Sequence, residues 1–246
     1  MKQPIFNRYE RKYLINETTM QICIDYFKNY LSFDPYSLGG KHYTIYNLYF
    51  DTTDFSIIRS SIQKPRYKEK LRLRTYDNPV EKHSTVYLEI KKKYLRRVNK
   101  RRVTLSYEDA LNYLDNKVFP TFDNYHDQQM MKEIDYFIHV HQAKPGAYIK
   151  YDRIALISAS DDIRITFDFN IQYRTTSLNL DDQSGQSILP HKDSVIMEIK
   201  SDQNFPFWIV DKLSELKIYS QSFSKYGKAY EYYIGGITDD DTLNGH

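Results

Sequence analysis

The chain has 246 residues and a formal net charge of only +3, so overall charge does not predict a strongly acidic or basic partner. Its length allows one sizeable core, its 8 Gly and 8 Pro exclude collagen-like and low-complexity chains, and its 24 Tyr favour β-strands. The single cysteine cannot form an internal disulfide, and we find neither a signal peptide nor an apolar run of about 18 residues, so we expect a soluble, cytoplasmic protein.

Strand and helix patterns alternate along the first half of the chain. Period-two alternation and strand-forming residues predict strands at residues 8–15, 41–51, 70–74, 87–91 and 100–105. Helical spacing predicts helices at 17–33, from about 53 toward 61, around 106–114, and within 120–142. Asn16 and Ser106 are expected to cap the helices that follow them. Cys23 lies on an apolar helix stripe, which favours a core position over a nucleophile.

Strands return in the second half, and helices close the chain. The patterns predict strands at 147–154, 163–169 and 194–200, a loop at 180–192, and helices at 206–216 and up to about 233. We expect one domain spanning residues 1–246, with a disordered tail after about residue 236. His126, His139 and His141 lack a compact metal-ligand spacing, so no zinc site is expected.

Cations recur at every second position of several predicted strands. Lys70, Arg72 and Arg74 are separated by leucines, and successive strand side chains point to opposite faces, so one face is basic and the other apolar. A single strand face with alternating charged residues is usually exposed to solvent. Taken together, however, faces dominated by Arg and Lys repel one another across neighbouring strands unless an anion lies between them. The pattern therefore predicts a polyanion ligand.

Closing such a sheet into a barrel would place the basic faces in a lumen and the apolar faces against amphipathic helices, which predicts an α+β fold. A closed lumen admits a phosphate chain more easily than a nucleic-acid strand, so no nucleic acid is expected as a partner. The sparse acids Glu10, Glu89, Asp168 and Glu198 could hold Mg²⁺ or Mn²⁺ beside phosphate. Ion pairing with neighbouring cations is the alternative, and we prefer it for Glu89.

An ordered set of short motifs carries a family resemblance. The motifs are Arg8-x-Glu10-x-Lys12-Tyr13, Tyr49-Phe50-Asp51-Thr52, Lys70-x-Arg72-x-Arg74, Leu88-Glu89-Ile90-Lys91, Lys100-Arg101-Arg102, Tyr151-Asp152-Arg153, Arg164-Ile165-Thr166-Phe167-Asp168, Glu198-Ile199-Lys200 and Ser224-Lys225-Tyr226-x-Lys228. Over roughly residues 7–234 the chain resembles the VTC domain, the polyphosphate polymerase domain of the vacuolar transporter chaperone complex. That domain belongs to the triphosphate tunnel metalloenzymes, also called the CYTH superfamily.

The resemblance implies an antiparallel eight-stranded β-barrel tunnel with a basic lumen, helices on the outside, and ATP or polyphosphate inside. By motif, the implied phosphate ligands are Lys12, Arg72, Arg74, Lys91, Arg153, Arg164, Lys200, Lys225 and Lys228. Glu10, Lys70, Lys100 and Arg102 are added as substrate-binding residues. Glu198 is the implied ligand of Mn²⁺ or Mg²⁺. The alternation of side chains along a strand does not by itself decide which of Lys100, Arg101 and Arg102 faces the lumen.

Two departures from the wider superfamily bear on function. The common opening Glu-x-Glu-x-Lys has Arg8 at its first position, which removes a carboxylate, adds a cation and favours a polymerase. We also expect neither the SPX domain nor the membrane helices of the eukaryotic subunits, and a membrane-protein partner stays open. Three functions remain: a polyphosphate polymerase using ATP, a triphosphatase in the same tunnel, and a non-catalytic polyphosphate-binding module.

Overall fold

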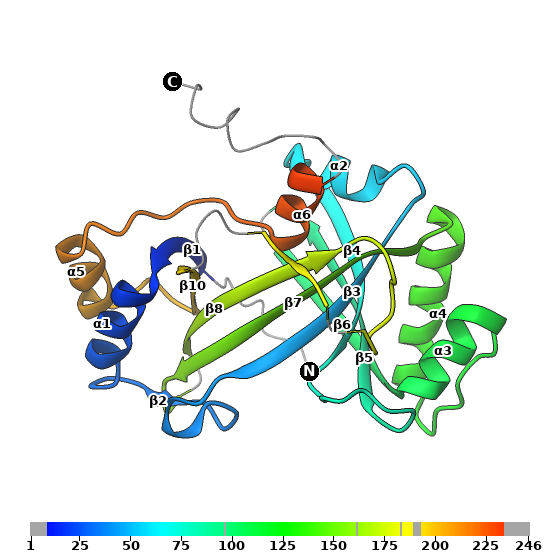
Figure 1. Ribbon diagram of the computed structural model, residues 1–246, viewed down its shortest axis with the longest axis horizontal. Helices are drawn as coiled ribbons and strands as arrows, with labels where there is room; N and C mark the ends of the chain where they lie inside the picture. The colour runs from blue at the N-terminus through cyan, green and yellow to red at the C-terminus, as the bar shows by residue number, and fades with distance from the viewer. Residues whose placement is uncertain (1–8, 96, 161, 183, 189–192, 234–246) are drawn as a thin grey trace. The chain divides into compact units, whose positions relative to one another are not determined.

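The chain forms an α+β fold with a large antiparallel sheet, and the computed structural model describes residues 9–95, 97–160, 162–182, 184–188 and 193–233 (Figure 1). The strands are β1 (Tyr9–Asn16), β2 (Ser32–Phe33), β3 (Tyr43–Asp51), β4 (Tyr67–Thr75), β5 (Thr85–Tyr94), β6 (Arg97–Ser106), β7 (Lys144–Ile157), β8 (Ile163–Arg174), β9 (Gln186–Ser187) and β10 (Ser194–Ser201). The helices are α1 (Glu17–Phe27), the 3-10 helix η1 (Leu38–Gly40), α2 (Ser56–Ile62), α3 (Tyr107–Asn116), α4 (Tyr125–His141), α5 (Phe207–Glu215) and α6 (Lys225–Tyr233).

Most predicted elements are confirmed, and two predicted caps form as expected. The Thr19 amide donates to the Asn16 side chain at 2.8 Å, and the Asp109 amide donates to the Ser106 hydroxyl at 3.0 Å. Both contacts satisfy backbone donors in a first helical turn. Within the predicted loop 180–192, the two-residue strand β9 pairs with β8. Arg8 and the predicted tail lie outside the described residues.

One predicted helix was too long. The helix expected over residues 17–33 ends at Phe27, and Ser32–Phe33 forms β2, which pairs with β7. The apolar spacing continued past the helix because Tyr30 and Leu31 pack from a turn instead. Leu31 is buried, and the Tyr30 ring stacks on Trp208 with centroids 4.3 Å apart. The packed side chains of Tyr30 and Leu31 therefore continue the apolar pattern of the sequence beyond the end of the helix.

The chain divides into two compact units, each assembled from separate segments. Unit 1 comprises residues 1–44, 151–171 and 189–224, and unit 2 comprises residues 45–150, 172–188 and 225–246. Strands β3, β7 and β8 each contribute residues to both units. The expectation of a single domain stays a prediction.

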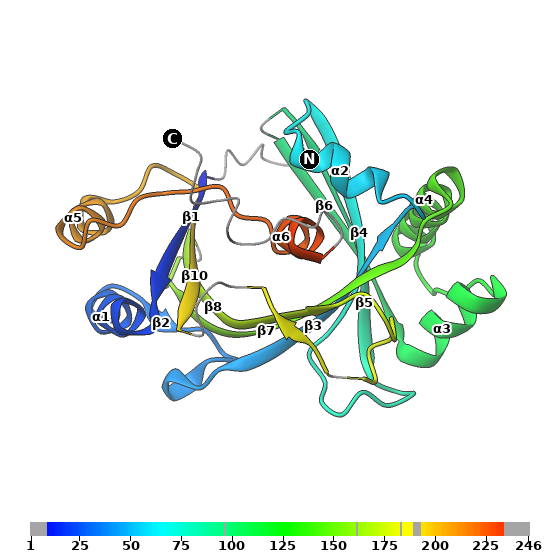
Figure 2. The ribbon, with the colours of Figure 1, turned by 45° about the horizontal axis from the view of Figure 1, so that its top comes forward.

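In unit 1 the strand order is β1-β10-β8-β7, with β2 paired to β7. One sheet face is apolar and packs against α1 and α5, which lie side by side in Figure 2. Phe27 of α1 and Leu213 of α5 belong to this buried core together with Met197 and Phe167 from the strands. Cys23 is in the same core, as predicted, and burial raises the pKa of its thiol to about 11. The opposite face carries the charged side chains.

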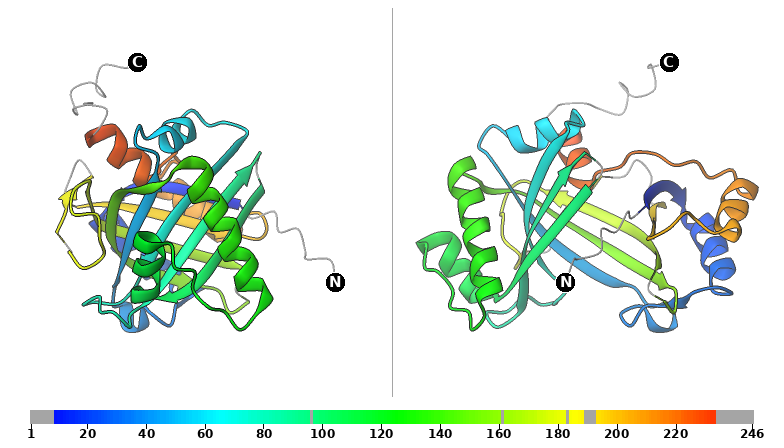
Figure 3. Two further views of the ribbon diagram at one scale, coloured as in Figure 1. Left: turned by 90° about the vertical axis from the view of Figure 1, so that its right-hand side faces the viewer. Right: turned by 180° about the vertical axis from the view of Figure 1, so that it is seen from behind.

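In unit 2 the strand order is β7-β3-β4-β5-β6. Helices α3 and α4 cover the apolar face of this sheet (Figure 3), and their Tyr113 and Ile134 join a core that contains Leu73 and Leu88. Helix α6 lies on the other side. Its Tyr226 ring stacks on Tyr49 of β3 at 4.9 Å, and α6 also contacts α2. The polar face of this sheet is therefore overlaid by one short helix.

Candidate functional site

Three rows of side chains cross the polar face of unit 2, fixed by the antiparallel register of its strands. The rows are Lys70, Lys91 and Lys100; Tyr49, Arg72, Glu89 and Arg102; and Asn47, Arg74, Tyr87 and Thr104. These rows hold six cations and a single carboxylate. The first row places three lysines directly opposite one another on adjacent strands, which is destabilising when nothing else intervenes. The predicted basic face is thus assembled in unit 2.

The single carboxylate, Glu89, is shared by three cations. Arg72 reaches it through Nε and Nη2 at 2.7 Å, Lys100 Nζ lies 2.6 Å away, and Arg74 Nε lies 3.9 Å away. Burial alone would raise the pKa of Glu89, but these three cations lower it to about 2. Glu89 is therefore ionised at neutral pH, and the ion pairing that we prefer for it is present. Within these three rows the cations therefore outnumber the carboxylates by six to one.

The structure decides between the three consecutive cations of β6. Lys100 pairs with Glu89, and the Arg102 guanidinium lies 4.7 Å from the centre of the Tyr87 ring, so both lie on the polar face. Arg101 instead donates to Glu133 of α4 at 2.8 Å, on the helix-covered side. Because successive side chains of a strand point to opposite faces, the two predicted binding residues, Lys100 and Arg102, share the polar face and Arg101 lies on the other.

Two groups on this face titrate near pH 8. Burial raises the pKa of the Tyr49 phenol, but Arg72, Arg74 and Lys70 outweigh it and lower that pKa to about 8. The Arg72 Nη1 atom donates to the Tyr49 hydroxyl at 3.2 Å. Burial also lowers the pKa of Lys100 to about 8, assisted by the same arginines and opposed by Glu89. No role was predicted for Tyr49 because it is uncharged, although one of the sequence motifs contains it.

Helix α6 carries the predicted ligands Lys225 and Lys228 and is tied to the polar face by a buried contact. The Tyr226 hydroxyl donates to Asp51 Oδ2 at 2.8 Å, and Asp51 also accepts the backbone amides of Ile57 and Ile58 at 3.0 Å. A Cβ at Gly146 would lie 3.1 Å from the Tyr226 hydroxyl and 3.2 Å from Asp51 Cβ. The glycine leaves room for this contact, which fixes where α6 begins.

Asp51 and Tyr226 were named in motifs, yet no sequence signal joined them, because they are 175 positions apart. Lys228 forms an ion pair with Glu231 of the same helix at 2.9 Å. Lys225 and Lys228 are three positions apart on α6, as predicted, and so lie on one side of it.

The polar face of unit 1 has a different charge balance. Glu198 lies 2.5 Å from Lys200 and 3.5 Å from Lys12, and Glu10 lies 3.8 Å from the same Lys12. Burial lowers the pKa of Lys12, but Glu198, Glu10 and Asp168 outweigh it and raise that pKa above its ordinary value. Lys12 Nζ also donates to the Phe223 carbonyl at 3.0 Å. Lys12 therefore stays protonated and holds two carboxylates near each other.

The two arginines predicted on this face are also paired with acids. Arg153 donates two hydrogen bonds to Asp168, at 2.6 and 2.8 Å, and Asp168 outweighs burial to raise the pKa of Arg153 well above its ordinary value. Arg164 lies 2.5 Å from Asp34, which is buried and also accepts the Ser37 amide. Asp34 comes from the turn after β2 and was not predicted. Four cations on this face thus meet four carboxylates: Lys12, Arg153, Arg164 and Lys200 with Glu10, Asp34, Asp168 and Glu198.

The donor set of unit 1 fits a hard divalent cation that is shared with phosphate. Among the described residues, no three Asp, Glu, His or Cys side chains are arranged to hold a metal by themselves. Mg²⁺ usually takes only one or two carboxylates and completes its shell with water and substrate phosphates. Glu198 and Glu10, both turned toward Lys12, supply that number of carboxylates.

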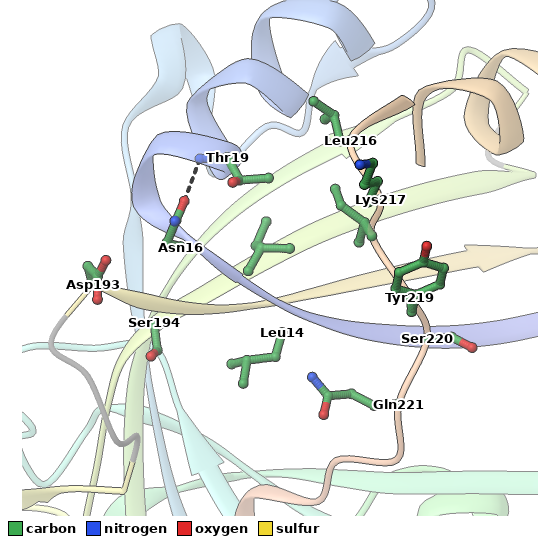
Figure 4. A pocket seen from close by; sticks show the side chains of 12 residues that line it. Leu14, Asn16, Thr19, Asp193, Ser194, Leu216, Lys217, Tyr219, Ser220 and Gln221 are labelled. Atoms are coloured by element: carbon green, nitrogen blue, oxygen red, sulfur yellow. Dashed lines mark hydrogen bonds between the residues drawn. The ribbon is translucent and has the colours of Figure 1, made fainter. Parts of the chain in front are cut away.

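A cavity of about 770 Å³ lies beside β1 in unit 1 (Figure 4). Leu14 and Asn16 line it on one side and Tyr219 and Gln221 on the other. None of the predicted site residues lines it. The cavity is therefore separate from the charged clusters described above.

An antiparallel-sheet protein with six cations in three rows of one face has the features of an anion-binding protein. The sequence profile of the VTC domain matches residues 7–234, and the chain belongs to this family. Family membership implies triphosphate ligands in a tunnel of the CYTH type, which agrees with the resemblance found in the sequence. No curated protein matches the chain in sequence.

One solved structure shows the same fold at low identity, and a second is only weakly similar. A Bacillus halodurans protein provisionally described as an adenylate cyclase is 16% identical with a TM-score of 0.54, over 89% of this chain and 95% of its own. A conserved hypothetical protein from Pyrococcus furiosus is 13% identical with a TM-score of 0.39, over 95% and 93% of the two chains. The second likeness is too weak to carry an argument. Within the described part of the chain, no helix has the length and apolar character needed to cross a membrane.

Proposed function

We propose that this protein is a metal-dependent phosphotransferase that transfers the terminal phosphoryl group of ATP to a growing polyphosphate chain. The observation that carries the proposal is the polar face of unit 2, where three rows of side chains contain six cations and one carboxylate. Family membership supports a triphosphate or polyphosphate as the ligand. The predicted closure of the sheet into a tunnel and the cytoplasmic location belong to the same proposal.

A phosphate chain suits this face because its charges repeat. Residues on one face of a strand recur about every 6.6 Å and neighbouring strands lie about 4.8 Å apart, so the rows form a lattice of cations. Arg72, Arg74 and Arg102 can each donate two parallel hydrogen bonds to phosphate oxygens, and lysines add compact charge. Such a lattice binds a thin polyanion at several points.

In the proposed reaction, a terminal oxygen of the polyphosphate attacks the γ-phosphorus of ATP, the bond to the bridging oxygen breaks, and ADP leaves. This chemistry needs in-line positioning and charge neutralisation, and it needs no Ser, Cys or His nucleophile. Glu89 holds Arg72 and Lys100 in fixed positions before substrate arrives. These donors therefore need little rearrangement when negative charge develops on the transferred group.

Glu198, with Glu10 beside it, is the proposed metal-binding position. When bound there, Mn²⁺ or Mg²⁺ would neutralise charge on phosphate oxygens. Lys12 and Lys200 form ion pairs with the Glu198 carboxylate and orient it. In this proposal, Arg and Lys side chains bind phosphate, and the carboxylates of Glu198 and Glu10 bind the metal ion.

Incubating the purified protein with ATP and Mn²⁺, and resolving long chains from free phosphate on a gel, tests the proposal. The polymerase function predicts long chains that appear as ATP is consumed and that are absent in EDTA. Free phosphate without chains would identify a triphosphatase. Polyphosphate binding without consumption of ATP would identify a non-catalytic binding module. Either of the last two results contradicts the proposal.

A further inference from the structure

The side chain of Thr166 is buried without a hydrogen-bond partner. Only 3% of Thr166 is exposed, and its hydroxyl oxygen meets no partner among the described residues. Buried hydroxyls normally have a partner, because removing one from water without a replacement destabilises the fold. An unsatisfied hydroxyl in a native strand therefore points to a ligand, an ion or a water at that position.

Thr166 lies on the polar face of unit 1, directly opposite Glu198 in the pairing of β8 with β10. Side chains at such positions share a face, with Cβ atoms about 4.5–5.5 Å apart. On the same face of β8, its neighbours Arg164 and Asp168 are engaged in ion pairs with Asp34 and Arg153. The Thr166 hydroxyl thus lies between two ion pairs and beside the proposed metal-binding carboxylate.

The oxygen atoms gathered here are the kind that hard cations select. Carboxylate and hydroxyl oxygens bind Mg²⁺ and Mn²⁺, whereas a valine of nearly the same shape at position 166 would offer nothing. Glu198 is engaged by Lys200 at 2.5 Å and by Lys12 at 3.5 Å and does not satisfy the hydroxyl. A cation at Glu198 would provide the missing partner for Thr166.

We propose that the Thr166 hydroxyl and the Glu198 carboxylate together form the binding site of the divalent cation. The inference rests on the proposed function only in that a divalent cation accompanies the phosphate substrate. It adds a neutral oxygen ligand from β8 to the carboxylate of β10.

The test compares Thr166→Val, which keeps the volume and loses the hydroxyl, with Thr166→Ser, which keeps the hydroxyl. Binding of Mn²⁺ is followed by the loss of the free-ion electron paramagnetic resonance signal, in the presence of a non-hydrolysable ATP analogue, so no turnover is needed. We expect Thr166→Val to raise the Kd for Mn²⁺ about tenfold, as loss of a supporting partner typically does. Thr166→Ser should bind Mn²⁺ close to the parental affinity.

Thermal unfolding in EDTA supplies the second readout. Because valine replaces an unpartnered hydroxyl, Thr166→Val should melt at or above the parental temperature, whereas Thr166→Ser should melt lower because it loses a buried methyl group. Parental Mn²⁺ affinity in Thr166→Val would overturn the inference. So would a melting temperature of Thr166→Val below that of Thr166→Ser.

Glu198→Gln separates this inference from the proposed function. Loss of Mn²⁺ binding in Glu198→Gln but not in Thr166→Val overturns the role of Thr166 and leaves the metal position standing. Weakened Mn²⁺ binding in both variants supports the shared site, even if the parent protein forms no polyphosphate from ATP.

Discussion

The two polar faces of this protein are built from the same alternating strand pattern but differ in charge balance. In unit 1, four cations meet four carboxylates, whereas three rows of unit 2 contain six cations and one carboxylate, Glu89. The difference shows that alternation of charge along a strand does not by itself identify an anion site. What distinguishes the two faces is the ratio of cations to carboxylates among side chains that lie opposite one another.

The balance also suggests a division of labour between the two faces. The charges of unit 1 are compensated within the fold, so that face can persist without a ligand and its carboxylates can serve a cation. The charges of unit 2 repel one another, and an anion would relieve that repulsion. Each face can therefore be perturbed separately.

Removing Glu89 should have the largest effect, because it leaves Arg72, Arg74 and Lys100 without their shared buried partner. We expect Glu89→Gln to reduce the free energy of unfolding by about 3–5 kcal/mol, the usual result of breaking a buried ion pair. Chemical denaturation at neutral pH measures this loss.

The direction in which the free energy of unfolding changes with pH provides a control for the ion-pair role of Glu89. Its pKa is about 2 in the folded protein against an ordinary 4.5, so its stabilisation is present above pH 4.5 and is lost as the pH falls toward 2. Parent and Glu89→Gln should therefore converge in stability in acid. A constant difference across that range would contradict the ion-pair account.

Glu198→Gln should affect turnover more than stability, because its partners Lys12 and Lys200 are partly exposed. We expect polyphosphate synthesis to fall by about a hundredfold or more, since even supporting residues of metal sites contribute about 10–100-fold. Binding of polyphosphate in EDTA should remain parental. Near-parental synthesis in Mn²⁺ would show that Glu198 is not the ligand, and Glu10 would be tested next.

Arg72→Ala should weaken polyphosphate binding itself, and Arg101→Ala provides a matched control. Arg72 lies on the polar face, whereas Arg101 pairs with Glu133 on the helix-covered side. Loss of a charge-assisted hydrogen bond of about 1.5–3 kcal/mol predicts at least about a tenfold higher Kd for Arg72→Ala. Arg101→Ala should bind normally. Equal losses in both variants would mean that binding reflects general positive charge, not this face.

A change of pH should have a smaller effect on the affinity for polyphosphate. Between pH 7 and pH 9, Lys100 loses a positive charge and Tyr49 gains a negative one, because both have a pKa of about 8. Both changes weaken anion binding, so affinity for long-chain polyphosphate in EDTA should fall over this range. The double variant Tyr49→Phe, Lys100→Arg should flatten the profile, and an unchanged slope would contradict the assignment.

The sequence predicted the strands and the polar faces well, because a period of two assigns side chains to faces before any contact is known. It did not choose between Arg101 and its neighbours, since that choice depends on the register that sets Arg102 opposite Glu89. It also missed Asp34, which reaches Arg164 from a turn. Arg and Lys therefore outnumber the acids in the three rows of unit 2 but not on the polar face of unit 1.

Uncharged members of the site were equally hard to predict. Asn47 accepts from Arg74 Nε at 2.8 Å and Tyr49 accepts from Arg72, but neither residue stands out beside a row of cations in the sequence. Their roles depend on strand pairing, which places β3 beside β4.

A crystal structure with tripolyphosphate and Mn²⁺ would test the division of labour most directly, because anomalous scattering locates manganese independently of phosphate. We predict phosphate on Arg72, Arg74 and Lys100, and a manganese peak within bonding distance of Glu198. Phosphate bound away from the polar face of unit 2, or manganese bound away from Glu198, would contradict this account.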